Sequence, residues 1–205
     1  VLNRHEQGAT HMADGYARST GKPGVVVVTS GPGATNTITG ILTAQMDSVP
    51  MVVITGQAST NVLGLDAFQE ADVSGVSFSI VKHSYLIKRS EDVSRIAREA
   101  LHLSQTGRPG VVLVDIPKDI SSQMIEPNFA EAFHLPGYVV PKEGDLESIE
   151  EAARLLSRSR RPVLIVGHGA VISGAEKAVT YLAEKLQIPA MNTLLGKGCF
   201  PETHE

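Results

Sequence analysis

The pattern of apolar and polar positions predicts strands and helices in alternation. Between Ala9 and Ala17, apolar residues recur every three or four positions, which is the spacing of a helix packed on one face. The run 24–30 is β-branched without polar alternation, as in a strand buried on both faces of a parallel sheet. A helix is predicted from Ala34 through Gln45. Further strands are predicted at 51–55, 84–88, 110–115, 162–167 and 188–193, and further helices at 91–104, 146–157 and 174–186.

This alternation predicts an α/β fold, with a doubly wound parallel sheet followed by the start of a second α/β domain. Residues 116–144 are richer in proline and polar residues and show no sustained period, which indicates a linker and a domain boundary within 120–145. The first residue is Val1 rather than Met, and no capping element follows the last predicted strand. We therefore expect a fragment of a longer chain at both ends.

The composition narrows the classes of partner. The 205 residues carry a net charge of −4, and Lys and Arg are scattered, so no basic surface for nucleic acid is expected. The longest apolar runs are far shorter than the ~20 residues of a membrane span. A single cysteine, Cys199, excludes an intrachain disulfide framework and suits a reducing compartment such as the cytoplasm or an organelle lumen. We expect a soluble protein without nucleic-acid or membrane partners.

Glu6 has two interpretations. On a helix it shares the face of Ala9 and Ala13, and its small neighbours Gly8 and Gly15 would let another surface approach closely. A carboxylate in such a dry place would have a raised pKa and need a partner, which suits acid–base chemistry. The alternative is an ordinary acidic residue in a first helical turn, which complements the helix dipole.

Two loops could carry a ligand. The turn 31–36 lies where a strand meets a helix, at the carboxyl edge of the sheet, where open α/β folds bind ligands. It lacks the third glycine of a dinucleotide fingerprint and the Lys-Ser/Thr pair of a phosphate loop, so an ordinary Gly/Pro turn remains an alternative. The segment 66–70 mixes an aromatic side chain, an amide and two carboxylates in a long loop, which could equally be a solvated loop.

Other chemistries find little support. The seven histidines have no HExxH spacing and Cys199 has no second thiol, so no metal site is predicted within the chain. No Gly-x-Ser-x-Gly elbow is present, which disfavours nucleophilic hydrolysis. The Gly167-His168-Gly169 turn matches a dinucleotide turn only in part.

Several motifs occur together in one order. They are Arg4-His5-Glu6-Gln7-Gly8-Ala9, Gly15-Tyr16-Ala17-Arg18, Thr29-Ser30-Gly31-Pro32-Gly33-Ala34-Thr35-Asn36, Asp66-Ala67-Phe68-Gln69-Glu70, Gly107-Arg108-Pro109-Gly110 and Asp115-Ile116-Pro117-Lys118-Asp119. With these motifs the chain resembles, over essentially its whole length, the large catalytic subunits of the acetolactate (acetohydroxyacid) synthase family of thiamine-diphosphate enzymes. The resemblance implies a pyrimidine-binding domain at 1–118 that lacks its first elements, a linker at 119–145, and the beginning of a central domain at 146–205. The domain that binds the diphosphate and Mg²⁺ would lie outside this chain.

The resemblance also implies roles for single residues. Glu6 would hydrogen-bond the aminopyrimidine of thiamine diphosphate and favour its imino tautomer, which removes the thiazolium proton. The resulting carbanion would attack pyruvate, release carbon dioxide and add to a second 2-ketoacid, a step of branched-chain amino-acid biosynthesis. The other implied contacts are Thr29, Pro32 and Asn36 to thiamine diphosphate, Phe68, Gln69 and Lys118 to the substrate, and Arg108, Thr193 and Leu194 to FAD.

The implied partners are a second copy of the catalytic subunit, with which the active site forms, and a regulatory small subunit. The implied location is the cytoplasm, or a plastid or mitochondrion in a eukaryote. Leu65, Val111 and His168 depart from the usual pattern, and these departures bear more on the flavin than on Glu6. Alternatives are another thiamine-diphosphate decarboxylase, oxidase or carboligase, such as an oxalyl-CoA decarboxylase or a pyruvate oxidase, or a truncated subunit without catalysis. Glyoxylate carboligase is disfavoured, since it carries Val at the position of Glu6.

Overall fold

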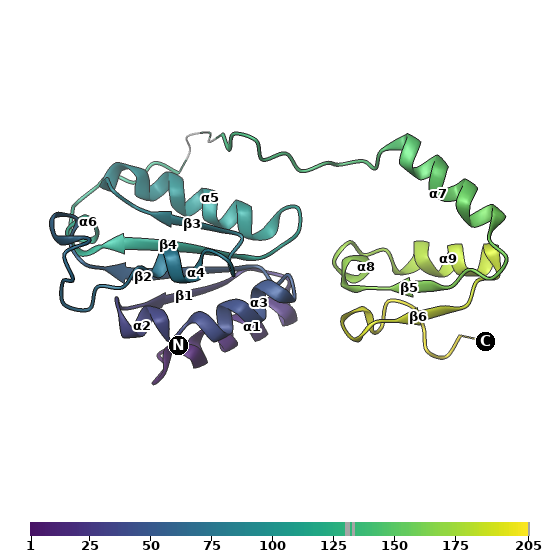
Figure 1. The fold of residues 1–205 in the computed structure, drawn as a ribbon, viewed down its shortest axis with the longest axis horizontal. Coiled ribbons are helices and arrows are strands. Elements are labelled where there is room, and N and C mark those ends of the chain that lie inside the picture. The colour runs from purple at the N-terminus through teal and green to yellow at the C-terminus, as the bar shows by residue number, and fades with distance from the viewer. Residues whose placement is uncertain (130–131, 133, 205) are drawn as a thin grey trace. The chain divides into compact units, whose positions relative to one another are not determined.

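The computed structural model describes residues 1–129, 132 and 134–204. The chain forms two compact units, Val1–Val140 and Pro141–Glu205 (Figure 1). The first unit contains all of the predicted site residues except Thr193 and Leu194, which belong to the second.

The first unit is built on a four-stranded sheet in the order β1-β2-β4-β3, in which every neighbouring pair is parallel. The strands are β1 (Gly24–Val28), β2 (Met51–Gln57), β3 (His83–Leu86) and β4 (Val111–Pro117). The helices are α1 (Glu6–Thr20), α2 (Pro32–Thr35), α3 (Ile38–Met46), α4 (Val73–Ser77), α5 (Val93–Gln105) and α6 (Lys118–Ser121), with 3-10 turns η1 (Thr60–Val62) and η2 (Ser90–Asp92). The region expected to be a linker, 116–144, thus includes the end of β4 and α6.

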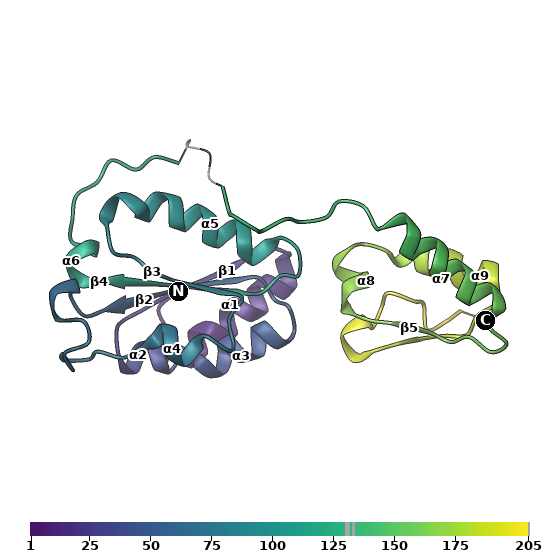
Figure 2. The ribbon, with the colours of Figure 1, turned by 45° about the horizontal axis from the view of Figure 1, so that its top comes forward.

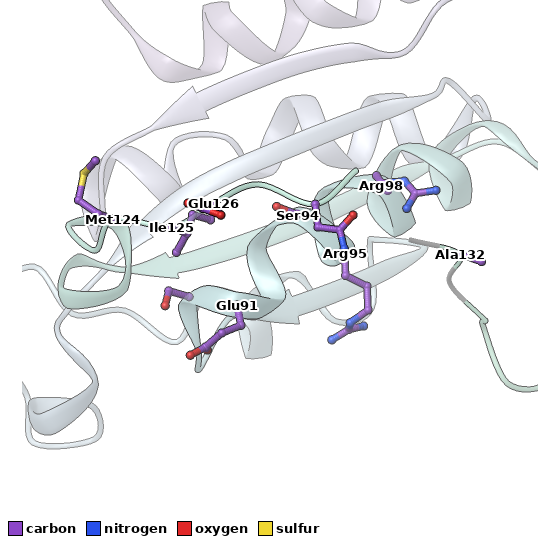
Figure 3. Close-up of a pocket in the computed structure, with 10 residues that line it drawn as sticks. Glu91, Ser94, Arg95, Arg98, Met124, Ile125, Glu126 and Ala132 are labelled. Atoms are coloured by element: carbon purple, nitrogen blue, oxygen red, sulfur yellow. The ribbon is translucent and has the colours of Figure 1, made fainter. Parts of the chain in front are cut away.

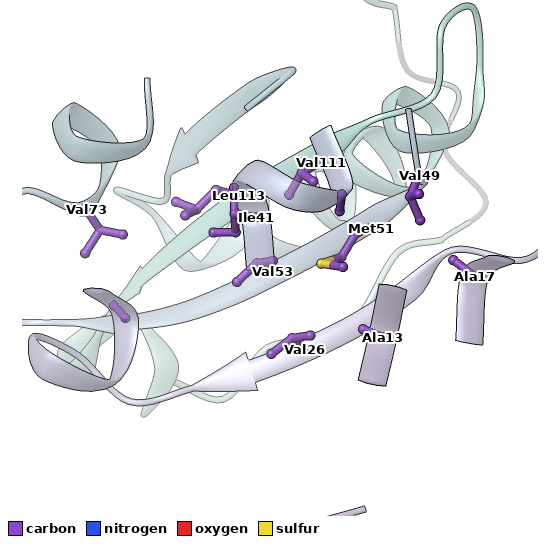
Figure 4. Packing of buried hydrophobic residues seen from close by; sticks show 12 residues of the cluster. Ala13, Ala17, Val26, Ile41, Val49, Met51, Val53, Val73, Val111 and Leu113 are labelled. Atoms are coloured by element: carbon purple, nitrogen blue, oxygen red, sulfur yellow. The ribbon is translucent and has the colours of Figure 1, made fainter. Parts of the chain in front are cut away.

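Helices cover both faces of the sheet, as the predicted doubly wound fold requires (Figure 2). Alternate residues of β2 and β4 point to opposite faces. Met51, Val53, Val111 and Leu113 pack with Ala13, Ile41 and other residues of the α1 and α3 layer (Figure 4). Val52, Val112 and Val114 pack with Ile96, Ala100 and Leu103 of α5. The unbroken apolar runs of these two strands follow from burial on both sides.

β1 departs from the prediction. Val26 is buried, but Val25 is 54% and Val27 is 72% exposed, so the expectation of burial on both faces is wrong here. β1 lies at one edge of the sheet and pairs with β2, whereas α5, which covers that face, packs on β2, β3 and β4.

One predicted helix is divided in the structure. The helix expected from Ala34 through Gln45 is two helices, α2 and α3, because the amide of Thr37 bonds to the carbonyl of Ala34, three residues back, and so interrupts the i to i−4 ladder. The side-chain hydroxyl of Thr37 donates to the same carbonyl at 2.6 Å.

The second unit holds a two-stranded parallel sheet, β5 (Leu164–Val166) with β6 (Ala190–Asn192). Its helices are α7 (Leu146–Arg158), α8 (His168–Ile172) and α9 (Glu176–Leu186), followed by the 3-10 turn η3 (Leu194–Gly196). Both predicted strands and the helix predicted at 174–186 are present with shorter bounds, the helix predicted at 146–157 extends one residue further, and α8 was not predicted. None of the helices in the described part of the chain has the length and apolar character needed to cross a membrane.

Candidate functional site

A cavity lies at the carboxyl edge of the first sheet, where the segments following β1, β2 and β4 meet. Its volume is about 580 Å³. Its lining residues are Thr29, Ser30, Gly56, Gln57, Ala58, Ser59, Val62, Ala67, Phe68, Gln69, Ile116, Lys118 and Ser121. Four of the predicted site residues, from three separate strand ends, therefore line one space.

A neighbouring groove with a volume of about 650 Å³ lies along β1. That groove runs beside α1 and β1 and is lined by Glu6 and Thr29 among others. Thr29 lines both spaces, so Glu6 lies next to the cavity.

Glu6 is paired with Asn36 across 30 positions of sequence. The side-chain amide Nδ2 of Asn36 donates to Oε2 of Glu6 at 3.0 Å. Glu6 is the first residue of α1, whose N-cap is His5, and it is half-buried. The hydrogen bond from Asn36 is the main reason that the pKa of Glu6 lies below its ordinary value. The predicted need for a partner is met, but the expectation of a dry carboxyl group with a raised pKa is wrong, since Glu6 stays partly in contact with solvent.

Gly33 allows this arrangement. A Cβ atom at this position would lie 2.6 Å from Cγ2 of Thr29 and 3.3 Å from Oε1 of Glu6. A side chain would therefore push α2 away from the end of β1 and from the carboxylate. Pro32, the first residue of α2, is exposed beside it. Glu6, Thr29, Pro32 and Asn36 thus come together at one place.

The loop 58–72 lies against the same turn. Gly31 has φ +57°, and a Cβ atom there would lie 2.7 Å from the carbonyl oxygen of Gln69. Gln69 itself has φ +55°, an uncommon conformation for a residue with a side chain. Phe68 is 89% exposed. The loop therefore carries Phe68 and Gln69 to the edge of the Glu6 cluster.

Glu70 orders the tip of this loop. Its carboxylate accepts hydrogen bonds from the backbone amides of Gly64 and Ala67, the latter at 2.8 Å. These bonds, first that from Gly64, hold the pKa of Glu70 below its ordinary value. The sequence grouped Glu70 with the chemistry-bearing residues of the loop, whereas its contacts are those of a structural residue. Gly64 has φ +81°. This glycine was the residue in the sequence that could have indicated a tight turn in the loop.

The residues predicted to contact FAD lie elsewhere. Arg108 precedes β4, at the amino edge of the sheet, where its guanidinium donates to the hydroxyl of Ser48 at 2.8 Å and to the carbonyl of Met46 at 3.3 Å. Thr193 and Leu194 belong to the second unit. The Thr193 hydroxyl accepts from the amide of Gly196 at 3.1 Å, and Leu194 is 89% exposed. The structure does not bring Arg108 into the Glu6 cluster.

A further cavity of about 390 Å³ is lined by residues of η2 and α5 and by Met124, Ile125, Glu126, Asn128 and Ala132 (Figure 3). Glu91, Ser94 and Arg95 line it, and none of its described lining residues is a predicted site residue. Arg95 forms ion pairs with Asp92 and Glu99 at 2.9 and 2.7 Å. Its charge is thus already balanced within the protein.

Metal-binding chemistry has no counterpart in the described part of the chain. Among the residues that the structure describes, no three His, Cys, Asp or Glu side chains are grouped so that they could hold a metal ion. Cys199 is a free, buried cysteine.

Comparison with known families gives two matches. Residues 1–76 match the family described as "Thiamine pyrophosphate enzyme, N-terminal TPP binding domain". Residues 149–205 match "Thiamine pyrophosphate enzyme, central domain". The first match contains Glu6, Thr29, Pro32, Asn36, Phe68 and Gln69.

Curated relatives match over nearly the entire chain. An acetolactate synthase large subunit from Buchnera aphidicola subsp. Schizaphis graminum is 50% identical over 206 residues, which cover 100% of this chain and 36% of that protein. An acetolactate synthase from Arthrospira platensis is 50% identical over 205 residues, 99% of this chain and 35% of that protein. A probable acetolactate synthase large subunit from Methanocaldococcus jannaschii is 47% identical over 207 residues, 100% of this chain and 35% of that protein. The chain thus spans about a third of the length of these relatives.

Proposed function

Because the chain belongs to the family of thiamine pyrophosphate enzymes, we propose that it is part of an acetolactate synthase catalytic subunit. Such a subunit decarboxylates pyruvate and joins the remaining two-carbon unit to a second 2-ketoacid, as a step of branched-chain amino-acid biosynthesis. The observation that carries the proposal is the Glu6–Asn36 contact beside a cavity lined by Phe68, Gln69 and Lys118. It combines a positioned carboxylate with a space open to a small substrate.

The residues at this place fit the aminopyrimidine half of thiamine diphosphate. Asn36 holds Oε2 of Glu6, while Oε1 faces the gap kept open by Gly33. A carboxylate held in this way is suited to share a proton with a ring nitrogen. When bound, thiamine diphosphate supplies the electron sink that decarboxylation of a 2-ketoacid needs. Thr29 and Pro32 would complete the contacts to this ring.

The substrate would meet the other side of the cavity. Lys118, the first residue of α6, is exposed at its rim and supplies a positive charge for the carboxylate of a 2-ketoacid. Phe68 and Gln69 supply an apolar surface and an amide from the loop opposite. The two sides of the cavity thus offer different recognition to one small molecule.

We assign the parts of the chain accordingly. Residues 1–118 are the pyrimidine-binding domain, 119–145 the linker and 146–205 the beginning of the central domain. Arg108, Thr193 and Leu194 would contact FAD, and the diphosphate and Mg²⁺ would be held by sequence outside this chain. The proposed partners are a second catalytic subunit and a regulatory small subunit, and the proposed location is the cytoplasm or an organelle.

Product analysis of the full-length protein tests the function. With thiamine diphosphate, Mg²⁺ and pyruvate, we expect acetolactate and carbon dioxide in a ratio of one to one. Acetaldehyde, acetyl phosphate or acetate in place of acetolactate would replace this proposal with a decarboxylase or oxidase. No turnover of any 2-ketoacid would favour a subunit without catalysis.

The isolated 205-residue chain gives a second measurement. We expect no acetolactate from it, even with thiamine diphosphate and Mg²⁺ added, since its described residues offer no grouped ligands for the metal. Acetolactate formed by the purified chain would overturn the assignment of the diphosphate site to other sequence.

A further inference from the structure

A buried polar network lies beneath the cavity, at the carboxyl ends of β2 and β4. The hydroxyl of Thr55 donates to Oδ1 of Asp115 at 2.7 Å, and the amide Nε2 of Gln57 donates to Oδ2 of Asp115 at 2.9 Å. Thr55 and Asp115 are direct neighbours in the register of the two strands. Thr55, Gln57 and Asp115 are 1%, 7% and 2% exposed. Three polar side chains thus end two otherwise apolar strands.

Gln57 extends this network to both ends of the loop 58–72. Its Nε2 also donates to the carbonyl of Ala71 at 2.7 Å, and its Oε1 accepts from the amide of Ala58 at 2.8 Å. One side chain therefore ties the first residue of the loop to a residue near its end. Ala71 is two residues from Gln69, which packs against Gly31 beside the Glu6 cluster.

The contacts fix the orientation of the Gln57 amide. Both of its hydrogens point to oxygen acceptors, those of Asp115 and Ala71, and its oxygen faces the amide of Ala58. Turning the amide over would set its oxygen against the carbonyl of Ala71 and the carboxylate of Asp115. An acceptor at position 115 supports this orientation together with Ala58 and Ala71, and the Asp115 carboxylate accepts from Gln57 through one oxygen and from Thr55 through the other.

Burial raises the pKa of Asp115, while the hydrogen bonds from Thr55 and Gln57 act in the opposite direction. The network also survives protonation in principle, because the Thr55 hydroxyl can rotate to accept a proton while the other oxygen still accepts from Gln57. The arrangement thus serves to hold geometry rather than to transfer a proton.

We propose that Asp115 is a positioning residue for the 2-ketoacid site: through Gln57 it clasps the loop 58–72 and holds Phe68 and Gln69 against the Gly31 turn. This inference rests on the proposed function. Asp115 does not line the cavity, whereas Gln57 does. A loss of activity on changing Asp115 would therefore act through the loop.

Hydrogen exchange of the full-length protein tests the clasp directly. In Asp115→Leu, position 115 offers no acceptor to the Gln57 amide, so the clasp opens. We expect amides of 58–72 to exchange roughly tenfold to hundredfold faster, the range for a lost hydrogen bond to a charged group. Glu99→Leu is the matched control, because it removes another buried carboxylate, on α5, which is bonded to Arg95 at 2.7 Å. It should lower stability without accelerating exchange in this loop.

A double variant tests the route through Gln57. Gln57→Leu should release the loop by itself, and adding Asp115→Leu should then accelerate exchange by less than about threefold more, since the two residues act in one chain of contacts. Additive effects would overturn the proposal. If Asp115→Leu does not fold, Gln57→Leu carries the exchange test, because the Thr55–Asp115 bond stays intact in it.

Kinetics of the same variants give the functional readout. We expect Asp115→Leu to lower kcat/KM for pyruvate by roughly tenfold up to ~10²-fold, the loss typical of a small misplacement of a binding group. The Kd of thiamine diphosphate should change by less than about threefold, since Asp115 touches none of its proposed contacts. Equal kcat/KM in Asp115→Leu and the parent, with a released loop, would overturn the positioning role. A parent without activity on 2-ketoacids would refute the proposed function, while the exchange experiment would still test the clasp.

Discussion

The two edges of the first sheet use polar groups in opposite ways. At the amino edge, the ammonium of Lys82 donates to the carbonyls of Leu103, Thr106 and Arg108 at 2.6, 2.6 and 2.8 Å. These carbonyls lie at and just after the end of α5, where helical carbonyls lack partners within the helix. At the carboxyl edge, Phe68 and Lys118 are exposed around a cavity, and Glu6 accepts from Asn36 through Oε2 while its Oε1 faces Gly33.

This difference indicates that the amino edge of the sheet contributes to stability and the carboxyl edge to ligand binding. Groups at the amino edge satisfy one another within the protein, so they stabilise the fold but have little capacity left for a ligand. Groups at the carboxyl edge are held in place by a few contacts and remain open to solvent, which is how open α/β folds arrange ligand sites. Changes at the carboxyl edge should therefore alter activity, and changes at the amino edge should alter stability.

The largest expected effect is on activity, from Glu6→Gln in the full-length protein. The substitution keeps the size of the side chain and removes the carboxyl group that would share a proton with the cofactor. General acid–base help contributes typically ~10²–10⁴-fold in rate, so kcat should fall within that range. Exchange of the thiazolium proton of bound cofactor, followed by deuterium incorporation, should slow in step with turnover.

The control for Glu6→Gln is its folding. The thermal unfolding temperature and the affinity for thiamine diphosphate should change little, because the shape of this face of α1 is kept. Unchanged proton exchange in the Gln variant would return Glu6 to the class of first-turn acidic residues that only complement a helix dipole.

The sequence predicted the layers of this fold better than its local contacts. The unbroken apolar runs of β2 and β4 belong to strands that are buried on both faces, although such burial was predicted only for the run that forms β1. The run of β1 has the same composition, yet its Val25 and Val27 are exposed. Composition shows that a strand can be covered on two faces, but which helix lies over it depends on contacts between distant segments.

The candidate site shows the same limit. The resemblance singled out Glu6 and Asn36 separately, but their hydrogen bond joins residues 30 positions apart. The lowered pKa of Glu6 depends on that bond and on partial exposure, neither of which periodicity reports. Asp115 was named only as part of a motif, without a role, and Thr55 and Gln57 were not singled out, although polar residues near the end of an apolar strand were a visible signal.

The next largest effect, after that of Glu6→Gln, is expected from Lys82→Met, which should lower the stability of the first unit. The variant keeps the apolar stem and leaves three carbonyls and the hydroxyl of Tyr138, which lies 3.0 Å from the Lys82 ammonium, without this donor. Hydrogen bonds to a charged group contribute about 1.5–3 kcal/mol, so the free energy of unfolding of the first unit should fall by about that amount in urea titrations. Lys22→Met, at an exposed position, is the control. Equal stability of the two variants would contradict the contrast between the edges.

Asn36→Ala should change the pKa of the Glu6 carboxyl group. Removing the amide that donates to Oε2 of Glu6 takes away the main cause of its lowered pKa. We expect the pKa of Glu6 to rise toward its ordinary value in a carbon-13 NMR titration of the side-chain carboxyl. Thr35→Ala, which removes a neighbouring exposed hydroxyl bonded to the carbonyl of Pro32, should leave that titration unchanged.

The smallest effect is expected in the loop 58–72, when the pH is lowered and Glu70 becomes protonated. The folded-state pKa of Glu70 lies below the ordinary value of 4.5, so the stabilisation by its bonds to Gly64 and Ala67 is fully present above that value. It is lost as the pH falls through the lower, folded-state pKa. The amide nitrogen shifts of Gly64 and Ala67 should therefore move together with an inflection below pH 4.5. In Glu70→Gln the shared inflection should disappear, whereas Glu91→Gln, on η2 away from this loop, should preserve it. An inflection that persists in Glu70→Gln would assign the titration to another carboxylate and weaken the view that the carboxyl edge is ordered by a few separable contacts.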